Sequence, residues 1–130
     1  EKSCIGTIVN LSSIAAQRTQ SELMAFSVSC AAMDQMTRSL AVSLAPERVR
    51  VNAVAFGSVM SASLKGHLKQ HPDQREAILA ATPQARIAGP TEVAEAVQFL
   101  ASDSSAFVTG EILTVDGGRS LIDAVSTSLH

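Results

Sequence analysis

The stretch AFSVSCAAMDQMTRSL, which runs from Ala25 to Leu40, decides the fold, because the segments on either side of it serve as scaffolding for one long helix. Apolar residues recur within it and just beyond it at intervals of three, four or seven positions, which is helical rather than strand periodicity. Phe26 and Cys30 lie four residues apart, so they project from the same face of this helix. We expect that face to point at a ligand.

The helix is predicted to run from about Glu22 to Leu44. Ser21 lies just before it and has a side chain suited to an N-cap, and Pro46 lies just beyond its end and stops it.

Strand-like segments flank this helix and recur near the end of the chain. Ile5 to Leu11 is mostly apolar and β-branched, which suits a strand buried on both faces of a parallel sheet. Arg48 to Ala55 and Ile112 to Val115 have similar character. A strand, a helix and a strand in this order predict a right-handed parallel crossover, and therefore an α/β fold.

Two short helices are predicted between the second and third strands, over Ser61–Gln70 and Pro72–Ala81, and a further one from about Gly89 to Ser102. The first two form a long excursion above the sheet, which is a common way to cover a ligand crevice. Three strands make a small sheet, so we expect an exposed apolar edge and one uncovered face. Something else should complete the sheet.

The composition excludes several classes of function. The 130 residues contain 46% hydrophobic and 17% charged side chains and carry a net charge of −2, so there is no basic face for nucleic acid or an anionic membrane. The sequence shows neither a membrane-spanning run nor a signal peptide. Cys4 and Cys30 have neither metal-type spacing nor the density of a secreted disulfide scaffold, so we expect the cytoplasm.

Five segments, taken together and in order, resemble the second half of a short-chain dehydrogenase/reductase. They are residues 6–13, the helix around Phe26, RVRVNAV at 48–54, GSV at 57–59, and VTG at 108–110 through VDGG at 115–118. The resemblance implies a Rossmann-like, doubly wound parallel sheet. Residues 1–130 would be the C-terminal part of one such domain, and the N-terminal nucleotide-binding half is absent from the sequence. The chain begins with Glu1 rather than Met, which fits a fragment, an incomplete structure or a natural short form equally well.

The resemblance implies hydride transfer between NAD or NADP and a small carbonyl or alcohol substrate. The family's catalytic serine falls on Ser13, with Ser12 as the weaker candidate, and its Tyr and Lys positions hold Phe26 and Cys30. Phe26 has no proton to give, and a thiol is a weak hydrogen-bond partner. The chain has no Tyr that could substitute, and its lysines are Lys2, Lys65 and Lys69. The sequence does not say whether these two replacements are natural or engineered.

The same resemblance places the nicotinamide end of the cofactor against a set of residues near the ends of the first two strands. Phe56 stands where the family usually has Pro. The residues that choose between NAD and NADP are not in this sequence. The implied cofactor-binding residues are Leu11, Cys30, Phe56, Gly57, Val59 and Ser61.

Several interpretations remain open at this stage. The chain is part of an oxidoreductase that is impaired or inactive as it stands, or it is a non-catalytic binding or assembly subunit, or it is an unrelated autonomous domain. In the family, the long helix and the last strand and helix pack between subunits, so the resemblance also implies a homo-oligomer, a dimer or a tetramer. His67 and His71 have the spacing of a pair of metal ligands but lack a third partner, so we expect no metal site.

Overall fold

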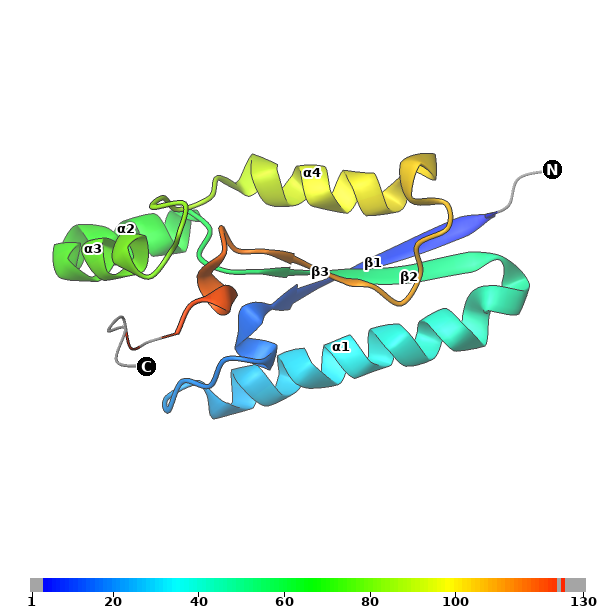
Figure 1. The fold of residues 1–130 in the computed structure, drawn as a ribbon, viewed down its shortest axis with the longest axis horizontal. Helices are drawn as coiled ribbons and strands as arrows, with labels where there is room; N and C mark the ends of the chain where they lie inside the picture. The colour runs from blue at the N-terminus through cyan, green and yellow to red at the C-terminus, as the bar shows by residue number, and fades with distance from the viewer. Residues whose placement is uncertain (1–3, 124, 126–130) are drawn as a thin grey trace.

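The structure is a computed structural model that describes residues 4–123 and 125. It is an α/β fold with a small parallel sheet between helices (Figure 1). The elements are β1 (Gly6–Ser13), α1 (Met24–Leu44), β2 (Val49–Phe56), α2 (Ala62–Gln70), α3 (Pro72–Ala80), α4 (Pro90–Ala101) and β3 (Ile112–Val115), with short 3-10 turns η1 (Ile14–Ala16), η2 (Ala45–Glu47), η3 (Asp103–Ser105) and η4 (Arg119–Leu121).

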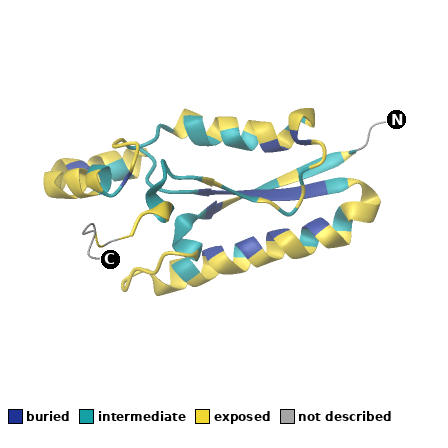
Figure 2. Ribbon diagram, viewed as in Figure 1, coloured by how far each residue is buried: buried dark blue, intermediate teal, exposed yellow. Residues whose placement is uncertain are grey.

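The three strands are parallel and lie in the order β1-β2-β3. β1 pairs with β2 over its whole length, from Gly6 opposite Val49 to Ser13 opposite Phe56, and β3 pairs with the last four residues of β2. The central strand is the core of the fold: its residues from Arg50 to Ala55 are all buried, as expected for a strand covered on both faces (Figure 2). All three strands therefore end at the same edge of the sheet.

Each face of the sheet carries one long helix, with α1 on one side and α4 on the other (Figure 1). The expectation of one uncovered face is wrong, because α4 crosses back over β1 and β2 before the chain enters β3. α1 turns Cys30, Asp34, Thr37 and Ala41 toward the sheet. Asn10 on β1 donates a hydrogen bond of 3.0 Å to the hydroxyl of Thr37, which fixes the helix against the strand.

Two predicted boundaries differ from the structure. α1 begins at Met24, and Ser21 is not its N-cap, because the Leu23 amide closes a turn onto the carbonyl of Gln20 and Leu23 takes the cap position. β1 continues through Ser13, since Ser12 and Ser13 stay in register with the end of β2. The predicted helices between β2 and β3 are confirmed, and Ser61 caps the first of them.

The predicted exposed apolar edge is confirmed at β1. In the described part of the chain β1 pairs only with β2, and Ile5, Ile8 and Leu11 are exposed, at 64%, 39% and 56%. The expectation that this strand is buried on both faces is therefore wrong, because α1 lies mainly over β2 and leaves the outer strand half covered. None of the described helices combines the length and the apolar character that a bilayer crossing requires.

Candidate active site

The loops that follow the three strands meet at one edge of the sheet and enclose a cavity of about 570 Å³. This is where ligands bind in open parallel α/β sheets, because helix ends and loops converge there. Its wall includes Ser13 at the end of β1, Phe26 from the first turn of α1 and Gly57 after β2. The residues that line it are Ser13, Ile14, Ala15, Arg18, Gln20, Leu23, Phe26, Gly57, Ser58, Ile78, Ala81, Arg119 and Ile122.

Ser13 is held by its own local structure. Its hydroxyl oxygen accepts a hydrogen bond of 3.1 Å from the Ala15 amide and so caps the turn η1. The hydroxyl of Ser27, in the first turns of α1, donates to the carbonyl of Ala15 and ties this turn to the helix. Because Ser13 acts as an acceptor in the cap, its own proton is left to be donated into the cavity. Its neighbour Ser12 is buried, does not line the cavity, and has a hydroxyl without a hydrogen-bond partner.

Phe26 and Cys30 occupy different environments although they lie one helical turn apart. Phe26 is 50% exposed and is one of the residues that line the cavity. Cys30 is 7% exposed and belongs to the face of α1 that packs on the sheet, and it is not part of the cavity wall. One turn further along, the buried carboxylate of Asp34 has an oxygen without a hydrogen-bond partner.

The other implied cofactor-binding residues lie at or near the same edge of the sheet. Phe56 ends β2 and stands between Ser13 and Val115 in register. Val59 forms a parallel bridge with Ala88, and the hydroxyl of Ser61 accepts a hydrogen bond of 3.1 Å from the Leu64 amide as the N-cap of α2. These contacts fix the chain that leaves β2.

Leu11 lies apart from that group, on the outer strand β1, where 56% of it is exposed. Gly57 is closely packed, since a Cβ atom on it would lie 3.0 Å from the Cβ of Asp116. A larger residue at Gly57 would therefore push the loop after β2 away from the end of β3.

Four polar residues of the cavity wall are not among the sequence predictions: Arg18, Gln20, Ser58 and Arg119. Arg18 follows β1, Ser58 follows β2 and Arg119 follows β3. Arg119 donates from Nη1 to the Ser58 hydroxyl over 2.8 Å. The signal that could have found them is topological: each lies in a loop that follows a strand, and the loops after parallel strands meet at one edge of the sheet.

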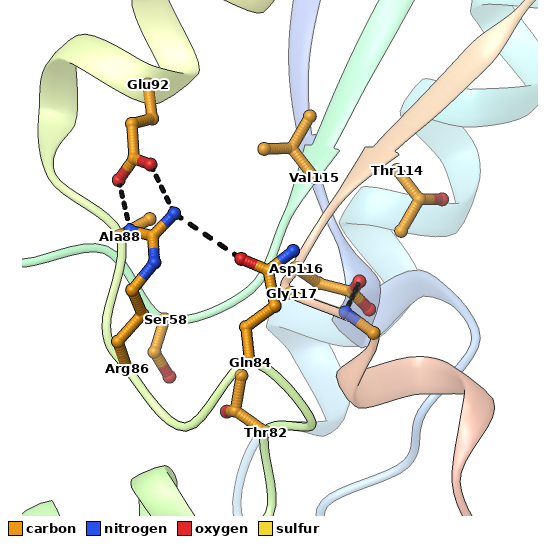
Figure 3. A pocket seen from close by; sticks show the side chains of 11 residues that line it. Ser58, Thr82, Gln84, Arg86, Ala88, Glu92, Thr114, Val115, Asp116 and Gly117 are labelled. Carbon is orange, nitrogen blue, oxygen red and sulfur yellow. Dashed lines mark hydrogen bonds and ion pairs between the residues drawn. The ribbon is translucent and has the colours of Figure 1, made fainter.

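A second cavity, of about 370 Å³, lies beside the first and shares Ser58 with it (Figure 3). Its charged groups are paired. Arg86 binds both carboxylate oxygens of Glu92, at 2.5 and 2.8 Å, and Glu92 also accepts from the Gly89 amide. The Arg86 guanidinium lowers the pKa of Glu92 to about 2, and the Gly89 bond acts in the same direction. Arg86 and Glu92 therefore neutralise each other in the wall of this cavity.

The turn after β3 separates the two cavities. The Asp116 carboxylate accepts from the amides of Gly118 and Ser120, at 2.9 and 2.8 Å. Desolvation acts to raise the pKa of Asp116, but these bonds and the charge of Arg119 outweigh it and lower that pKa. Gly117 has a φ of +63°, and a Cβ on it would lie 2.9 Å from the Cγ2 atom of Thr82. Asp116 is thus a structural residue of this turn, and the turn positions Arg119.

Neither lysine that the structure describes lines the first cavity, since Lys65 and Lys69 lie on α2; Lys2 falls outside the described residues. The rings of His67 and His71 lie 4.6 Å apart, and His67 contacts Gln74. Over residues 4–123 and 125, no group of three or more His, Cys, Asp or Glu side chains is arranged to hold a metal ion.

The sequence matches known proteins over nearly its whole length. The family described as enoyl-(acyl carrier protein) reductase matches residues 1–120. Cis-4-hydroxycyclohexanecarboxylate dehydrogenase from Sinomonas cyclohexanicum is 43% identical over 117 residues, which are 90% of this chain and 46% of that protein. The chain thus spans about half the length of the curated relatives that it matches.

Solved structures share the fold. Aldohexose dehydrogenase from Thermoplasma acidophilum matches with a TM-score of 0.86 and 32% identity, over 93% of this chain and 50% of that one. A short-chain oxidoreductase from Pseudomonas aeruginosa PAO1, solved with NADPH and described as having an atypical catalytic centre, matches with a TM-score of 0.80 and 34% identity, over 90% and 47%. By its sequence and its fold, this chain belongs to the short-chain dehydrogenase/reductase family.

Proposed function

We propose that the intact protein is an NAD(P)-dependent oxidoreductase that transfers hydride between a nicotinamide and a small carbonyl or alcohol. The observation that carries this proposal is that Ser13, Phe26 and Gly57, which come from three different segments, line one cavity at the carboxyl ends of the strands. Relatives named as dehydrogenases and reductases support the reaction class.

The residues present fit part of such a cofactor. Gly57 keeps the loop after β2 close to the end of β3, and the chain from Phe56 to Ser61 is fixed at the edge where a nicotinamide would lie. Cys30 does not fit the role of a lysine, because it is buried and carries a weak hydrogen-bonding group in place of an ammonium. A bound dinucleotide would supply the hydride. We propose that Phe56, Gly57, Val59 and Ser61 hold its nicotinamide end.

The chain's own side chains would then mainly position the substrate and would contribute little to proton transfer. Ser13 has a hydroxyl proton available to donate to the substrate oxygen. Phe26 would cover the reacting carbon with an apolar ring and exclude water, but it cannot donate or accept a proton. A positioned general acid typically contributes about 10² to 10⁴-fold to the rate. We therefore propose that turnover is strongly impaired in this form.

A non-catalytic binding or assembly subunit is the second candidate. It is favoured by the coincidence of two replacements, Phe26 and Cys30, which together remove the acid and its neighbouring cation. The neighbour from Pseudomonas aeruginosa has both an atypical centre and bound NADPH, so an altered centre in this fold is compatible with cofactor binding in that protein.

The test compares the wild-type intact protein with the Phe26→Tyr/Cys30→Lys double variant. We expect both proteins to quench or shift nicotinamide fluorescence on binding NADH or NADPH. We expect only the double variant to reduce a panel of ketones, with a gain of at least about 10²-fold. Cofactor binding with no hydride transfer in either protein would favour the non-catalytic subunit. Measurable turnover by the wild type would exclude that second candidate.

We further propose that this chain is the C-terminal part of a longer domain, whose N-terminal half would cover the open edge of β1. The exposed residues Ile5, Ile8 and Leu11 support this proposal. Exposed apolar residues on the outer face of α1, such as Val28 and Val42, fit a homo-oligomer contact. A cytoplasmic location is consistent with the two free cysteines.

A further inference from the structure

The charged side chains that line the first cavity all have the same sign. Arg18 and Arg119 line it, and none of its lining residues is an Asp or a Glu. The chain as a whole carries a net charge of −2. The wall of this cavity, with two arginines and no acidic residue, is therefore more positive than the protein as a whole. A cavity lined in this way attracts anions.

Arg119 is held with part of its guanidinium unused. Nη1 donates to the Ser58 hydroxyl over 2.8 Å, and within the described part of the chain no other acceptor bonds this side chain. The nearby carboxylate of Asp116 is occupied by two backbone amides and lies in the wall of the second cavity. The remaining N–H groups of Arg119 are therefore available to a ligand, in the planar arrangement that suits a carboxylate.

Arg18 stands on the turn that follows Ser13. Its backbone amide donates to the carbonyl of Ile14 over 2.9 Å, which fixes where the side chain starts. The side chain is exposed, and among the described residues none forms an ion pair with it. The contrast with Arg86 in the second cavity is clear, because Arg86 is bound to Glu92 at 2.5 Å.

The rest of the wall is largely apolar. Ile14, Leu23, Phe26, Ile78 and Ile122 contribute aliphatic or aromatic surface. The volume of about 570 Å³ is in the range of small-molecule sites. An apolar wall with a few convergent polar groups binds a compact apolar body and fixes its orientation through those groups.

We propose that Arg18 and Arg119 bind the carboxylate of a substrate that has a compact apolar body, and so orient its carbonyl or alcohol toward Ser13. The proposal deepens the proposed function and rests on it for the identity of the reacting group. The substrate class is an aliphatic or aromatic keto acid, or the corresponding hydroxy acid, in which the carboxylate is remote from the reacting carbon.

The test is a binding measurement, because it does not need turnover. Calorimetric titration of the intact protein compares 4-acetylbenzoate with 4-acetylbenzamide, a neutral compound of nearly the same shape. We expect the wild type to prefer the carboxylate by about tenfold or more. Arg18→Gln and Arg119→Gln should each remove most of this preference, and added salt should reduce it. Arg38→Gln is the matched control, because Arg38 lies on the exposed side of α1 outside the cavity.

The outcomes separate the two proposals. Equal affinity for the two compounds, or a preference that survives both Gln variants, would overturn the anion site whatever the cofactor does. The anion site would also be overturned if the Gln variants bound 4-acetylbenzoate as the wild type does but bound NADH or NADPH more weakly. The two arginines would then belong to the dinucleotide site. Failure of the proposed function is a different result: no nicotinamide binding, and no turnover in the Phe26→Tyr/Cys30→Lys protein. Arg18→Gln changes an exposed loop residue, so it keeps the test valid if Arg119→Gln fails to fold.

Discussion

The Oγ atom of Ser105 lies 3.0 Å from Nη1 of Arg50, in a buried hydrogen bond that joins the central strand to the turn after α4. Ser105 is 1% exposed, and its hydroxyl is also within 3.0 Å of the carbonyls of Phe99 and Leu100. Arg50 holds two further carbonyls with its other N–H groups. This contact therefore links α4 to the sheet whose loops form the cavity.

Ser105→Ala should destabilise the protein by about 1 to 3 kcal/mol, because it leaves a buried N–H group of Arg50 without an acceptor. The measurement is the urea midpoint of unfolding. Ser102→Ala is the matched control: the Ser102 hydroxyl is exposed, and Arg50 uses only its backbone carbonyl, so the change should stay within about 0.5 kcal/mol. Equal effects of the two substitutions would contradict this account.

Gly117→Ala should also destabilise the fold, by about 1 to 3 kcal/mol. The residue has a φ of +63°, and the added Cβ would lie 2.9 Å from Thr82, so both the backbone and the contact are strained. Gly66→Ala provides the opposite control, because nothing lies within 4 Å of a Cβ there and the position is inside α2. That change should stabilise the protein by up to about 1 kcal/mol. Thermal unfolding of the two variants measures both effects.

The Arg86–Glu92 pair predicts a loss of stability in acid. The pKa of Glu92 is depressed to about 2 in the folded protein, so its contribution is fully present above its ordinary value of 4.5 and is lost as the pH falls through about 2. The difference in urea midpoint between the wild type and Glu92→Gln should therefore shrink between about pH 5 and about pH 2. Glu95→Gln, an exposed position on the same helix, should show no such trend.

Some residues of this site could be predicted from the sequence, and others could not. Ser13, Phe26 and Gly57 could be placed together because the resemblance to the short-chain dehydrogenase/reductase family assigns all three positions to one site. Arg18 and Arg119 could not, because nothing in a polar loop says which side chain turns into the cavity. That depends on the turn after β3, which the Asp116 bonds and the left-handed Gly117 create only in the folded chain.

The fold, too, could be predicted only in part from the sequence. Helical and strand periodicities predicted all seven main elements, but not the placement of α4 over the second face of the sheet, which is a tertiary contact. The start of α1 was misplaced because a turn at Gln20–Leu23 competes with the cap that Ser21 offers. The turn in the loop before α1 thus determined where the helix begins, and the capping preference of Ser21 did not.

Cys4 should react with iodoacetamide faster than Cys30 near neutral pH. Desolvation acts to raise the pKa of Cys4, but the neighbouring Arg50 guanidinium and the Gly6 backbone outweigh this and lower the pKa, which increases the thiolate fraction. Cys30 is buried at 7% exposure and serves as the internal control. Peptide mapping after a short exposure measures both rates in one sample. Preferential labelling of Cys30 would show that exposure and charge around these thiols differ from this description.

The open edge of β1 predicts how residues 1–130 behave when they are produced without a partner. Ile5, Ile8 and Leu11 expose apolar surface beside a strand whose outer backbone groups are unpaired within the described residues, and such an edge recruits other chains. The isolated chain should therefore elute from a sizing column above its monomer mass. Ile8→Lys should shift it toward the monomer, because a charge next to a free strand edge opposes pairing with another chain. Val42→Lys on α1, which is 78% exposed, tests the other proposed contact, and it should leave the elution unchanged if the fragment associates through the strand edge. If Val42→Lys alone restores the monomer, self-association runs through the helix, and the homo-oligomer proposed for α1 gains support.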